Sequence, residues 1–363
     1  MKVAVVLGTR PEIVKMSPVI RELRSRGVNF FILHTGQHYD YKMDGAFFND
    51  LTLPEPEHNL GVGSGSHAEQ TGRIMVGIEK ILSSEHPDIT LVQGDTNTVL
   101  GGALVAAKLH KKIGHVEAGL RSFDRAMPEE INRVVADHVS DYLFAPTPVS
   151  KRNLLNEGID DRKIYVTGNT VVDALKQNLA LSLSRADALK DLGLEEGGYF
   201  LVTLHRAENV DDKARLRNIM RALRQLGKKY RTEVVFPVHP RTRKMMKTYG
   251  LSPKGIETTN PLGYLEFIQL ESRARLILTD SGGVQEEACI LGVPCVTLRD
   301  NTERPETVEV GANIVAGIDP ATILSSAQKI LERERSWENP FGDGEAGKRI
   351  VDIITNRKKL LLS

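Results

Sequence analysis

The stretch VAVVLGTRPE, residues 3–12, carries the pattern that decides the fold of this chain. Residues 3–7 form a short apolar run, which is typical of a strand buried on both faces of a parallel sheet. Gly8 and Thr9 follow as a turn, and residues 11–26 repeat apolar side chains at the helical period. The stretch therefore predicts a strand, a turn and a helix, which is the repeating unit of an α/β fold.

The same alternation continues along the whole chain. We predict further strands at 30–34, 89–92, 114–116, 142–145 and 164–166, and then at 200–204, 233–237, 275–278 and 294–298. Helices are predicted at 70–82, 98–109, 129–140, 213–228, 264–272, 284–291 and 320–332. A charged and then glycine-containing connection, residues 182–198, separates the two series. We therefore predict two doubly wound, Rossmann-like α/β domains facing a cleft, at 1–170 and 171–343, with a helical segment at 344–363 that can cross back to the first domain.

Composition excludes several classes of protein. The chain has 363 residues, of which 40% are hydrophobic and 26% charged, as in ordinary soluble globular proteins. The 48 Lys and Arg residues nearly cancel the 47 Asp and Glu residues, which gives no support for a nucleic-acid partner or a membrane surface. The first apolar run is too short for a signal peptide, and no stretch has the length of a membrane span. We expect a cytoplasmic protein.

Cysteines and cofactor motifs narrow the choice further. Cys289 and Cys295 lie in one apolar stretch, so we expect buried reduced thiols and no disulfide framework. No Cys/His spacing typical of a metal site is present, and we expect no metal. The turn at Gly8 lacks the Gly-x-Gly-x-x-Gly pattern, and no Walker sequence occurs. We therefore expect no nicotinamide, no ATP site and no other cofactor.

Polar residues follow the predicted strands of the first half. Ligands of open parallel sheets bind at the carboxyl ends of the strands, so these residues are the candidate site: Arg10, Lys15, Asp95, Glu117 and, at a helix start, Glu129. The two cations can neutralise phosphate oxygens, or they are solvated helix charges. The three carboxylates can divide acid and base roles. Each one alone also fits a surface or capping acid.

In the second half, Ser281, Gly282 and Gly283 follow residues 275–278 after Thr279 and Asp280. Two glycines let the backbone approach a ligand, and a helix N-terminus attracts anions, so this sequence suits a diphosphate site. An ordinary strand-to-helix turn with an N-cap serine explains the sequence equally well. Glu287, in the first turn of the predicted helix, can accept hydrogen bonds from ribose hydroxyls or simply favour the helix dipole.

Two further second-half residues are candidates for phosphate or sugar contacts. His205 follows residues 200–204 and fits a phosphate ligand or an acid, although strand-end histidines are often structural. Arg304 lies in the polar loop 301–306, which a charged turn would also explain. Converging charged groups from both halves are our main argument for an enzyme.

Seven blocks in order resemble the motifs of the non-hydrolysing UDP-N-acetylglucosamine 2-epimerases. They are GTRPE at 8–12, QGDT at 93–96, HVEAGLR at 115–121, PEEINR at 128–133, GNTVVDA at 168–174, TDSGGVQEE at 279–287 and RDNTERPE at 299–306. The resemblance runs from the first residues to NPFGDG at 339–344, nearly the whole chain. Seven ordered blocks are far more specific than any one of them.

The resemblance implies a glycosyltransferase-B-like fold, a homodimer, a role in cell-surface polysaccharide biosynthesis and reversible epimerisation of UDP-N-acetylglucosamine to UDP-N-acetylmannosamine. By the same resemblance, the second domain holds the UDP. The diphosphate and ribose would contact Ser281, Gly282, Gly283 and Glu287, and the uracil would contact Phe267. Phosphates or sugar would contact Arg10, Lys15, His205 and Arg304. The catalytic carboxylates would be Asp95, Glu117 and Glu129, with His205 as a further catalytic candidate.

One region departs from the bacterial pattern of this family. After the position of His38, bacterial relatives carry glutamines associated with a second, activating UDP-N-acetylglucosamine. Here Met43, Asp44 and Gly45 stand in that neighbourhood. The departure puts allosteric activation through those positions in doubt.

The chemistry of carbon 2 favours one route. Its proton lies next to an amide-bearing carbon, so direct abstraction is very unfavourable, and oxidation at carbon 3 would need a nicotinamide site. Expulsion of UDP instead acidifies carbon 2 and leads to a 2-acetamidoglucal. Four alternatives stay open: the same reaction on a UDP-2,3-diacetamido-uronic acid, a glycosyltransferase that uses a UDP-sugar, a hydrolysing epimerase, and a non-catalytic sugar-nucleotide sensor.

Overall fold

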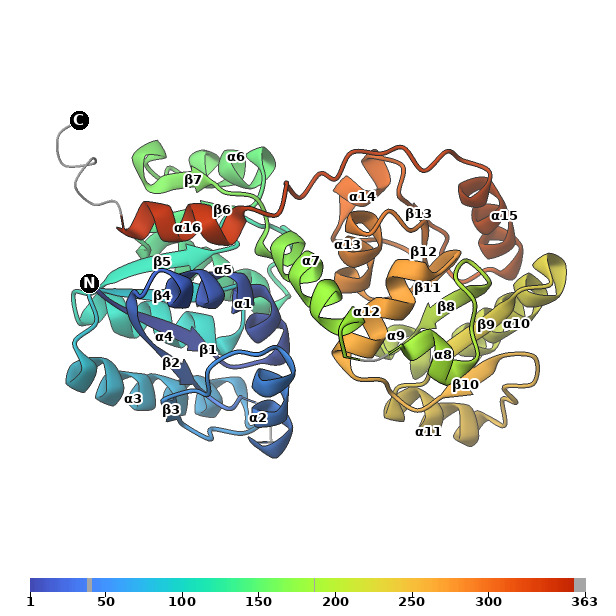
Figure 1. Ribbon diagram of the computed structural model, residues 1–363, viewed down its shortest axis with the longest axis horizontal. Coiled ribbons are helices and arrows are strands. Elements are labelled where there is room, and N and C mark those ends of the chain that lie inside the picture. The colour runs from blue at the N-terminus through green and yellow to red at the C-terminus, as the bar shows by residue number, and fades with distance from the viewer. Residues whose placement is uncertain (38–40, 186, 356–363) are drawn as a thin grey trace. The chain divides into compact units, whose positions relative to one another are not determined.

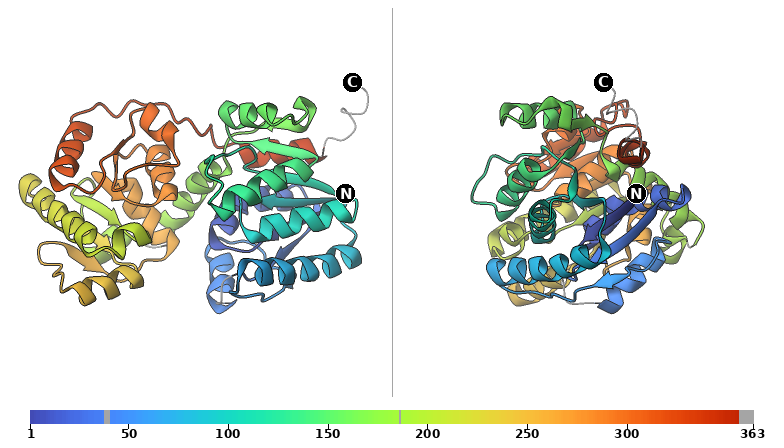
Figure 2. Two further views of the ribbon diagram at one scale, coloured as in Figure 1. Left: turned by 180° about the vertical axis from the view of Figure 1, so that it is seen from behind. Right: turned by 90° about the vertical axis from the view of Figure 1, so that its left-hand side faces the viewer.

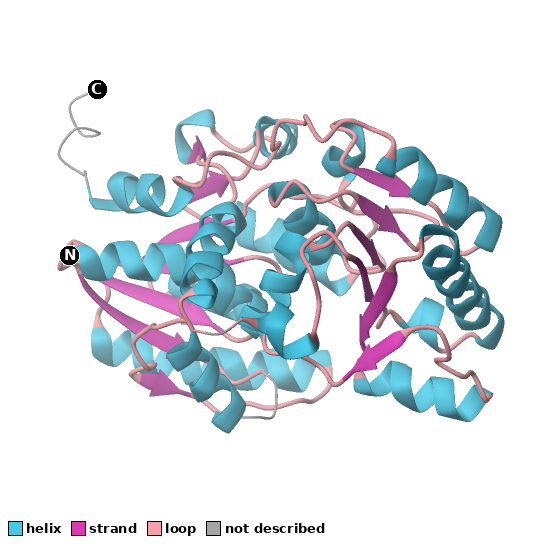
Figure 3. Ribbon diagram, turned by 45° about the vertical axis from the view of Figure 1, so that its right-hand side comes forward, coloured by secondary structure: helices cyan, strands magenta, loops and turns pink. Residues whose placement is uncertain are grey.

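The computed structural model describes residues 1–37, 41–185 and 187–355, and Figure 1 shows the course of the chain. The chain divides into two compact units. Unit 1 comprises Met1–Gln177 and the residues from Phe341 onward, and unit 2 comprises Asn178–Pro340. Each unit has a parallel sheet with helices on both of its faces (Figure 3). This confirms the predicted fold class of two Rossmann-like α/β domains.

The described residues of unit 1 contain a parallel sheet in the order β3-β2-β1-β4-β5-β6-β7. Its strands are β1 (Lys2–Leu7), β2 (Asn29–His34), β3 (His58–Asn59), β4 (Ile89–Gln93), β5 (Lys112–Val116), β6 (Tyr142–Ala145) and β7 (Ile164–Val166). From β1 to β3 each new strand is added on one side of β1, and from β4 to β7 each new strand is added on the other side. The strand order therefore reverses between β1 and β4, where Val5 pairs with Leu91. Ligands of such sheets bind beyond the carboxyl ends of the strands at this reversal.

Helices cover both faces of the unit 1 sheet. They are α1 (Arg10–Ser25), α2 (Tyr41–Asp50), α3 (His67–Glu85), α4 (Asn97–Lys108), α5 (Pro128–Val139), α6 (Pro148–Asn156) and α16 (Ala346–Thr355), with a short 3-10 turn at Asp161–Lys163. Helix α7 (Thr170–Leu183) begins in unit 1 and ends in unit 2, because the division falls after Gln177. Strand β1 is buried on both faces, as the apolar run predicts. Ala4 and Val6 pack with Ile74 and Ile78 of α3 in one core cluster.

The C-terminal helix α16 belongs to unit 1, where it packs against α1 (Figure 1, Figure 2). A methyl group added at Gly347 would lie 3.0 Å from the Cβ atom of Pro18, so the two helices are in close contact there. The Gly347 N–H donates to Asp173 over 2.8 Å, and Arg26 pairs with Asp352 at 2.6 Å. The last part of the segment predicted as helical, from residue 356 on, lies outside the described residues.

Unit 2 has the strand order of unit 1, without a counterpart of β7 in its described residues. In its described residues the strand order is β10-β9-β8-β11-β12-β13, and the reversal lies between β8 and β11, where Val202 pairs with Leu278. The strands are β8 (Tyr199–Thr203), β9 (Glu233–Pro237), β10 (Glu257–Thr259), β11 (Leu276–Thr279), β12 (Cys295–Thr297) and β13 (Asn313–Val315). A second switch point therefore lies at the carboxyl ends of β8 and β11.

Helix α10 illustrates why the unit 2 helices form where they do. Leu216, Ile219, Leu223 and Leu226 recur at helical spacing and are buried in one core cluster with the sheet. The helices of unit 2 are α8 (Ala188–Leu192), α9 (Ala207–Val210), α10 (Lys213–Tyr230), α11 (Pro240–Tyr249), α12 (Tyr264–Arg273), α13 (Gly282–Ile290), α14 (Pro305–Glu309) and α15 (Pro320–Leu331).

The structure also contains elements that the periodicity does not predict. The strands β3, β10 and β13 have two or three residues each, too few to show an alternation. The predicted connection 182–198 contains the short helix α8. No helix among the described residues is long and apolar enough to cross a membrane.

Candidate active site

The turn after β1 is bound to the turn after β4 by the buried side chain of Glu12. Its Oε2 atom accepts hydrogen bonds from the N–H groups of Gly8 and Thr9 over 2.6 and 2.7 Å, and Thr96 Oγ1 donates to Oε1 over 2.5 Å. Burial raises the pKa of Glu12 to about 7, although these hydrogen bonds oppose the shift. Two strand ends of the switch point are thus connected by one acid.

This acid should make the stability of the protein depend on pH. The folded state keeps the Glu12 proton up to about pH 7, whereas the unfolded chain loses it near 4.5. The contribution to stability is therefore complete below pH 4.5 and is lost as the pH rises to about 7. We expect urea unfolding to show Glu12→Gln gaining about 2–3 kcal/mol relative to the wild-type protein between about pH 5 and pH 8. An unchanged difference across this range would contradict the assignment.

Glu117 follows β5 and is buried, with a left-handed backbone (φ 72°) that is unusual for a residue with a side chain. The Lys15 ammonium lies 2.6 Å from Oε1, and the Gln93 amide donates to Oε2. The Asn169 amide donates to Oε1 over a longer 3.4 Å. Strained backbone of this kind costs about 1–3 kcal/mol and is typical of functional sites. Glu117 is thus a buried carboxylate whose charge Lys15 balances.

Asp95 lies one strand away from Glu117, at the end of β4. Its carboxylate is partly exposed and accepts a hydrogen bond from Arg133 of α5. Asn132 of the same helix donates to the Asp95 carbonyl over 2.9 Å. A methyl group added at Gly94 would lie 3.8 Å from Glu117 Oε2, so the two strand ends are close neighbours. Asp95 and Glu117 therefore share one edge of the sheet.

The start of α5 distinguishes two adjacent acids. Glu130 is buried and accepts hydrogen bonds from the N–H groups of Ser122 and Phe123 over 2.9 and 3.0 Å, and it pairs with Arg133 at 2.9 Å. Burial by itself raises the pKa of Glu130, but these hydrogen bonds and Arg133 outweigh it and lower that pKa. Glu129 is exposed, and its side chain makes no hydrogen bond or ion pair within the described ranges. Glu130 is therefore structural, and Glu129 is available to a ligand.

A buried chain of charges supports the Asp95 turn. His115 Nδ1 lies 2.7 Å from Asp137, and its Nε2 lies 2.8 Å from the carbonyl oxygen of Gly94. Arg121 Nη1 lies 2.8 Å from the other oxygen of Asp137. Burial by itself lowers the pKa of His115, but Asp137 and the Gly94 carbonyl outweigh it and raise that pKa. Both imidazole nitrogens donate, and the ring holds the residue that precedes Asp95.

Arg10 begins α1 and is exposed. Its guanidinium lies 5.8 Å from the centre of the Phe47 ring, within the range of a cation–π contact. The stretch that departs from the bacterial pattern includes His38, Met43 and Asp44. His38 lies outside the described residues, as do the side chains of Met43 and Asp44.

In unit 2, Asp280 organises the switch point from the end of β11. It is fully buried and accepts hydrogen bonds from the N–H groups of His205 and Arg206 over 3.1 and 3.0 Å. The His205 Nδ1 atom lies 3.3 Å from the same carboxylate, while 43% of the His205 side chain is exposed. Asn209 donates to Asp280 over 3.3 Å. His205 is thus anchored on one side and accessible on the other.

The helix α13 begins at Gly282, two residues earlier than predicted, with Ser281 as its N-cap. Gly283 is exposed, and a methyl group there would meet nothing closer than Ser281 Oγ at 3.9 Å. A ligand can therefore approach the free N–H groups of this first turn. The earlier start also corrects the position of Glu287, which lies in the second turn of α13 and not in the first.

Two other predicted ligand residues are held by contacts within unit 2, one by an ion pair and one by packing. Arg304 Nε lies 2.9 Å from the buried carboxylate of Glu286, and 22% of the arginine side chain is exposed. Phe267 of α12 is half-buried against the core cluster that also contains Val284.

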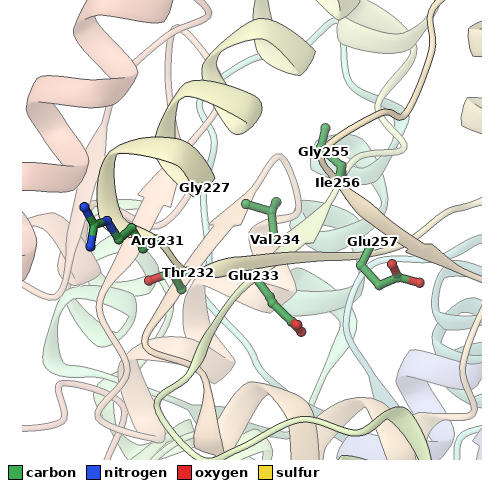
Figure 4. Close-up of a pocket in the computed structure, with 8 residues that line it drawn as sticks. All are labelled: Gly227, Arg231, Thr232, Glu233, Val234, Gly255, Ile256 and Glu257. Atoms are coloured by element: carbon green, nitrogen blue, oxygen red, sulfur yellow. The ribbon is translucent and has the colours of Figure 1, made fainter.

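A hollow of about 420 Å³ opens elsewhere in unit 2 (Figure 4). Its lining includes Glu233 and Glu257, the first residues of β9 and β10, so it lies at the amino ends of the strands. The candidate residues lie at the carboxyl ends, and this hollow is not their site. Among the described residues, no group of three or more His, Cys, Asp or Glu side chains could hold a metal ion.

Residues 21–355 match the protein family described as UDP-N-acetylglucosamine 2-epimerase. The chain belongs to this family. A UDP-N-acetylglucosamine 2-epimerase from Methanocaldococcus jannaschii is 55% identical over 99% of this chain and 100% of its own length. The solved structure of the epimerase from that organism, in complex with UDP-GlcNAc and UDP, has a TM-score of 0.88, is 55% identical, and covers 98% of this chain and 100% of its own. A UDP-2,3-diacetamido-2,3-dideoxy-D-glucuronate 2-epimerase from Pseudomonas aeruginosa is 42% identical over 98% of this chain and 99% of its own length.

The predicted site residues divide between the two units of this family member. Unit 1 holds Arg10, Lys15, Asp95, Glu117 and Glu129, and unit 2 holds His205, Phe267, Ser281, Gly282, Gly283, Glu287 and Arg304. Their roles stay predictions. Sequence reasoning missed the partners that hold them: Gln93, His115, Asn169 and Asp280. All four lie within the quoted blocks, so their position near strand ends was the available signal.

Proposed function

We propose that this protein inverts carbon 2 of UDP-N-acetylglucosamine to give UDP-N-acetylmannosamine, and that the reaction is reversible. The observation that carries the proposal is the pair of carboxylates on adjacent strand ends, Asp95 and the buried Glu117. Membership of the epimerase family supports the choice of substrate, because the similar Methanocaldococcus jannaschii structure holds UDP-GlcNAc and UDP.

Unit 2 would hold the nucleotide. The first turn of α13 offers the backbone N–H groups of Gly282 and Gly283 and the positive end of the helix dipole to the diphosphate. The exposed face of His205 can donate a further hydrogen bond to a phosphate oxygen. Glu287 would accept hydrogen bonds from ribose hydroxyls, and Phe267 would lie against uracil. These contacts stabilise UDP as a leaving group.

The chemistry begins with cleavage of the bond between carbon 1 and the phosphate oxygen, whose electron pair leaves with UDP. A carboxylate removes the proton from carbon 2, and a double bond between carbons 1 and 2 forms. Addition of a proton to the other face of carbon 2 and return of the UDP oxygen to carbon 1 give the epimer. Atoms and electrons balance without an external oxidant.

Asp95, Glu117 and Glu129 would carry out the proton transfers. Glu117 is buried and charge-balanced by Lys15, while Asp95 and Glu129 are accessible. Acids in such different surroundings can divide the acid and base roles.

Turnover in deuterated water tests the mechanism. Because carbon 2 loses its proton to an exchanging carboxyl group, we expect UDP-N-acetylmannosamine formed in deuterated water to carry deuterium at carbon 2. Proton NMR of the product sugar measures the loss of the carbon 2 signal, with heat-inactivated protein as the control. A product that keeps its original hydrogen at carbon 2 would exclude this route.

The uronic-acid substrate is a second candidate because of the Pseudomonas aeruginosa relative. The higher identity to the Methanocaldococcus jannaschii enzyme favours UDP-N-acetylglucosamine. Comparison of kcat/KM for the two UDP-sugars decides between them. Turnover without any added acceptor distinguishes either epimerase reaction from that of a glycosyltransferase. A product that still carries UDP distinguishes either reaction from that of a hydrolysing epimerase.

A further inference from the structure

Glu271, on helix α12, is a buried acid that the mechanism above does not use. Its side chain is fully buried, and no hydrogen-bond donor of the described residues reaches either carboxyl oxygen. The polar group in contact with it is the carboxyl of Glu287 on helix α13. A buried carboxylate without any donor would be very unfavourable. The surroundings of Glu271 therefore require an explanation.

A shared proton supplies this explanation. Two carboxyl groups in contact cannot both be ionised, and the proton stays on the more buried of the two. Burial, together with the neighbouring Glu287, raises the pKa of Glu271 well above its usual value. Two other titratable groups face Glu271, namely Tyr199 of β8 and Cys295 of β12, and burial raises the pKa of each. No cation among them competes for the Glu271 carboxyl.

We propose that Glu271 is a positioning residue whose carboxylic O–H donates to Glu287 and holds that carboxylate in place for the ribose hydroxyls of a uridine nucleotide. The inference rests on the proposed function, since it takes Glu287 as the ribose ligand. The acid O–H supplies the donor, and Glu287 keeps its negative charge for the ribose hydroxyls.

The position of Glu271 on α12 fits this role. Phe267 and Glu271 are four residues apart, so they lie on the same face of the helix. One turn of α12 would therefore place the uracil contact, and the next turn would support the ribose contact. The buried acid connects two parts of one nucleoside site.

Two substitutions separate the hydrogen bond from packing. Glu271→Gln keeps a donor of the same length, and Glu271→Met keeps the length and apolar packing but has no donor. Isothermal titration of the full-length proteins with UDP and with 2′,3′-dideoxy-UDP measures the ribose contribution directly. The dideoxy nucleotide has no ribose hydroxyl for Glu287 to bind, so it serves as the internal control for folding and for the diphosphate site.

We expect Glu271→Gln to bind UDP within about threefold of the wild-type protein at neutral pH, and Glu271→Met to bind it about 10–100-fold more weakly. All three proteins should bind 2′,3′-dideoxy-UDP with similar affinity. At alkaline pH the wild-type protein should lose affinity for UDP as Glu271 ionises, whereas Glu271→Gln should not.

Either of two results would overturn the inference: Glu271→Met binds UDP as tightly as the wild-type protein, or it weakens both nucleotides equally, which would indicate a merely structural role. Failure of the proposed function is recognised separately. In that case the wild-type protein itself does not epimerise UDP-N-acetylglucosamine, whatever the variants bind.

Discussion

Replacement of Glu117 by glutamine is expected to lower kcat for epimerisation of UDP-N-acetylglucosamine by about a hundredfold to ten-thousandfold. Glutamine has nearly the same shape, but it cannot take up or release a proton at the pH of the reaction. Its amide also removes the charge that Lys15 pairs with at 2.6 Å. Initial rates followed by proton NMR of the sugar products measure the effect.

The matched control is Glu85→Gln. Glu85 is also paired with a lysine, Lys2 at 2.5 Å, but Lys2 begins β1 and lies at the opposite end of the strand from the candidate site. This variant should keep the wild-type rate. UDP affinity of Glu117→Gln should stay within about a few-fold of the wild-type value, because most of the proposed UDP contacts, at Phe267, residues 281–283 and Glu287, lie in unit 2. A folded Glu117→Gln protein with more than a tenth of the wild-type kcat would exclude Glu117 from the proton transfers.

Removal of the Asp137 carboxylate should have the largest effect on stability. Asp137 is fully buried between His115 at 2.7 Å and Arg121 at 2.8 Å, and it accepts a hydrogen bond from Gly119 N–H over 3.1 Å. Alanine would leave two buried cations next to each other without this carboxylate. Breaking a buried charge cluster in this way costs about 3–5 kcal/mol. Urea unfolding of Asp137→Ala and the wild-type protein measures the difference.

Glu345→Ala provides the comparison for Asp137→Ala. Glu345 pairs with Lys348 at 3.3 Å, and the two side chains are 52% and 59% exposed. Solvent screens such a pair, and its loss should cost about 0.5 kcal/mol or less. If Asp137→Ala lowered the free energy of unfolding by no more than this control, the charge cluster would not stabilise the protein.

Most of the fold can be predicted from local patterns. The strand at residues 142–145 and the helix start at Lys213 agree with the structure, since apolar runs and helical periodicity are properties of consecutive residues. The short strands β3 and β13 could not be predicted, because the neighbouring strand and not their own sequence makes them strands.

The candidate site shows the same limit. Sequence reasoning finds Glu117 because it stands directly after an apolar run and Asp95 because it stands three residues after one, and it finds Lys15 one helical turn beyond Arg10. It does not show that the Lys15 ammonium lies on Glu117, because 102 positions separate them along the chain. Nor does it separate Glu129 from Glu130, since only the fold buries the second acid against the loop at Ser122.

The pattern that begins with residues 3–12 is therefore sufficient to predict the α/β class and the parallel sheets. It also predicts the sheet edges at which polar residues gather. The periods of strands and helices are local, and chain direction alone places strand ends together. The state of each acid was decided only by the tertiary structure. Whether Glu12, Glu117 or Glu271 is exposed, paired or protonated depends on burial and on partners from distant elements, and these exist only after the chain has packed.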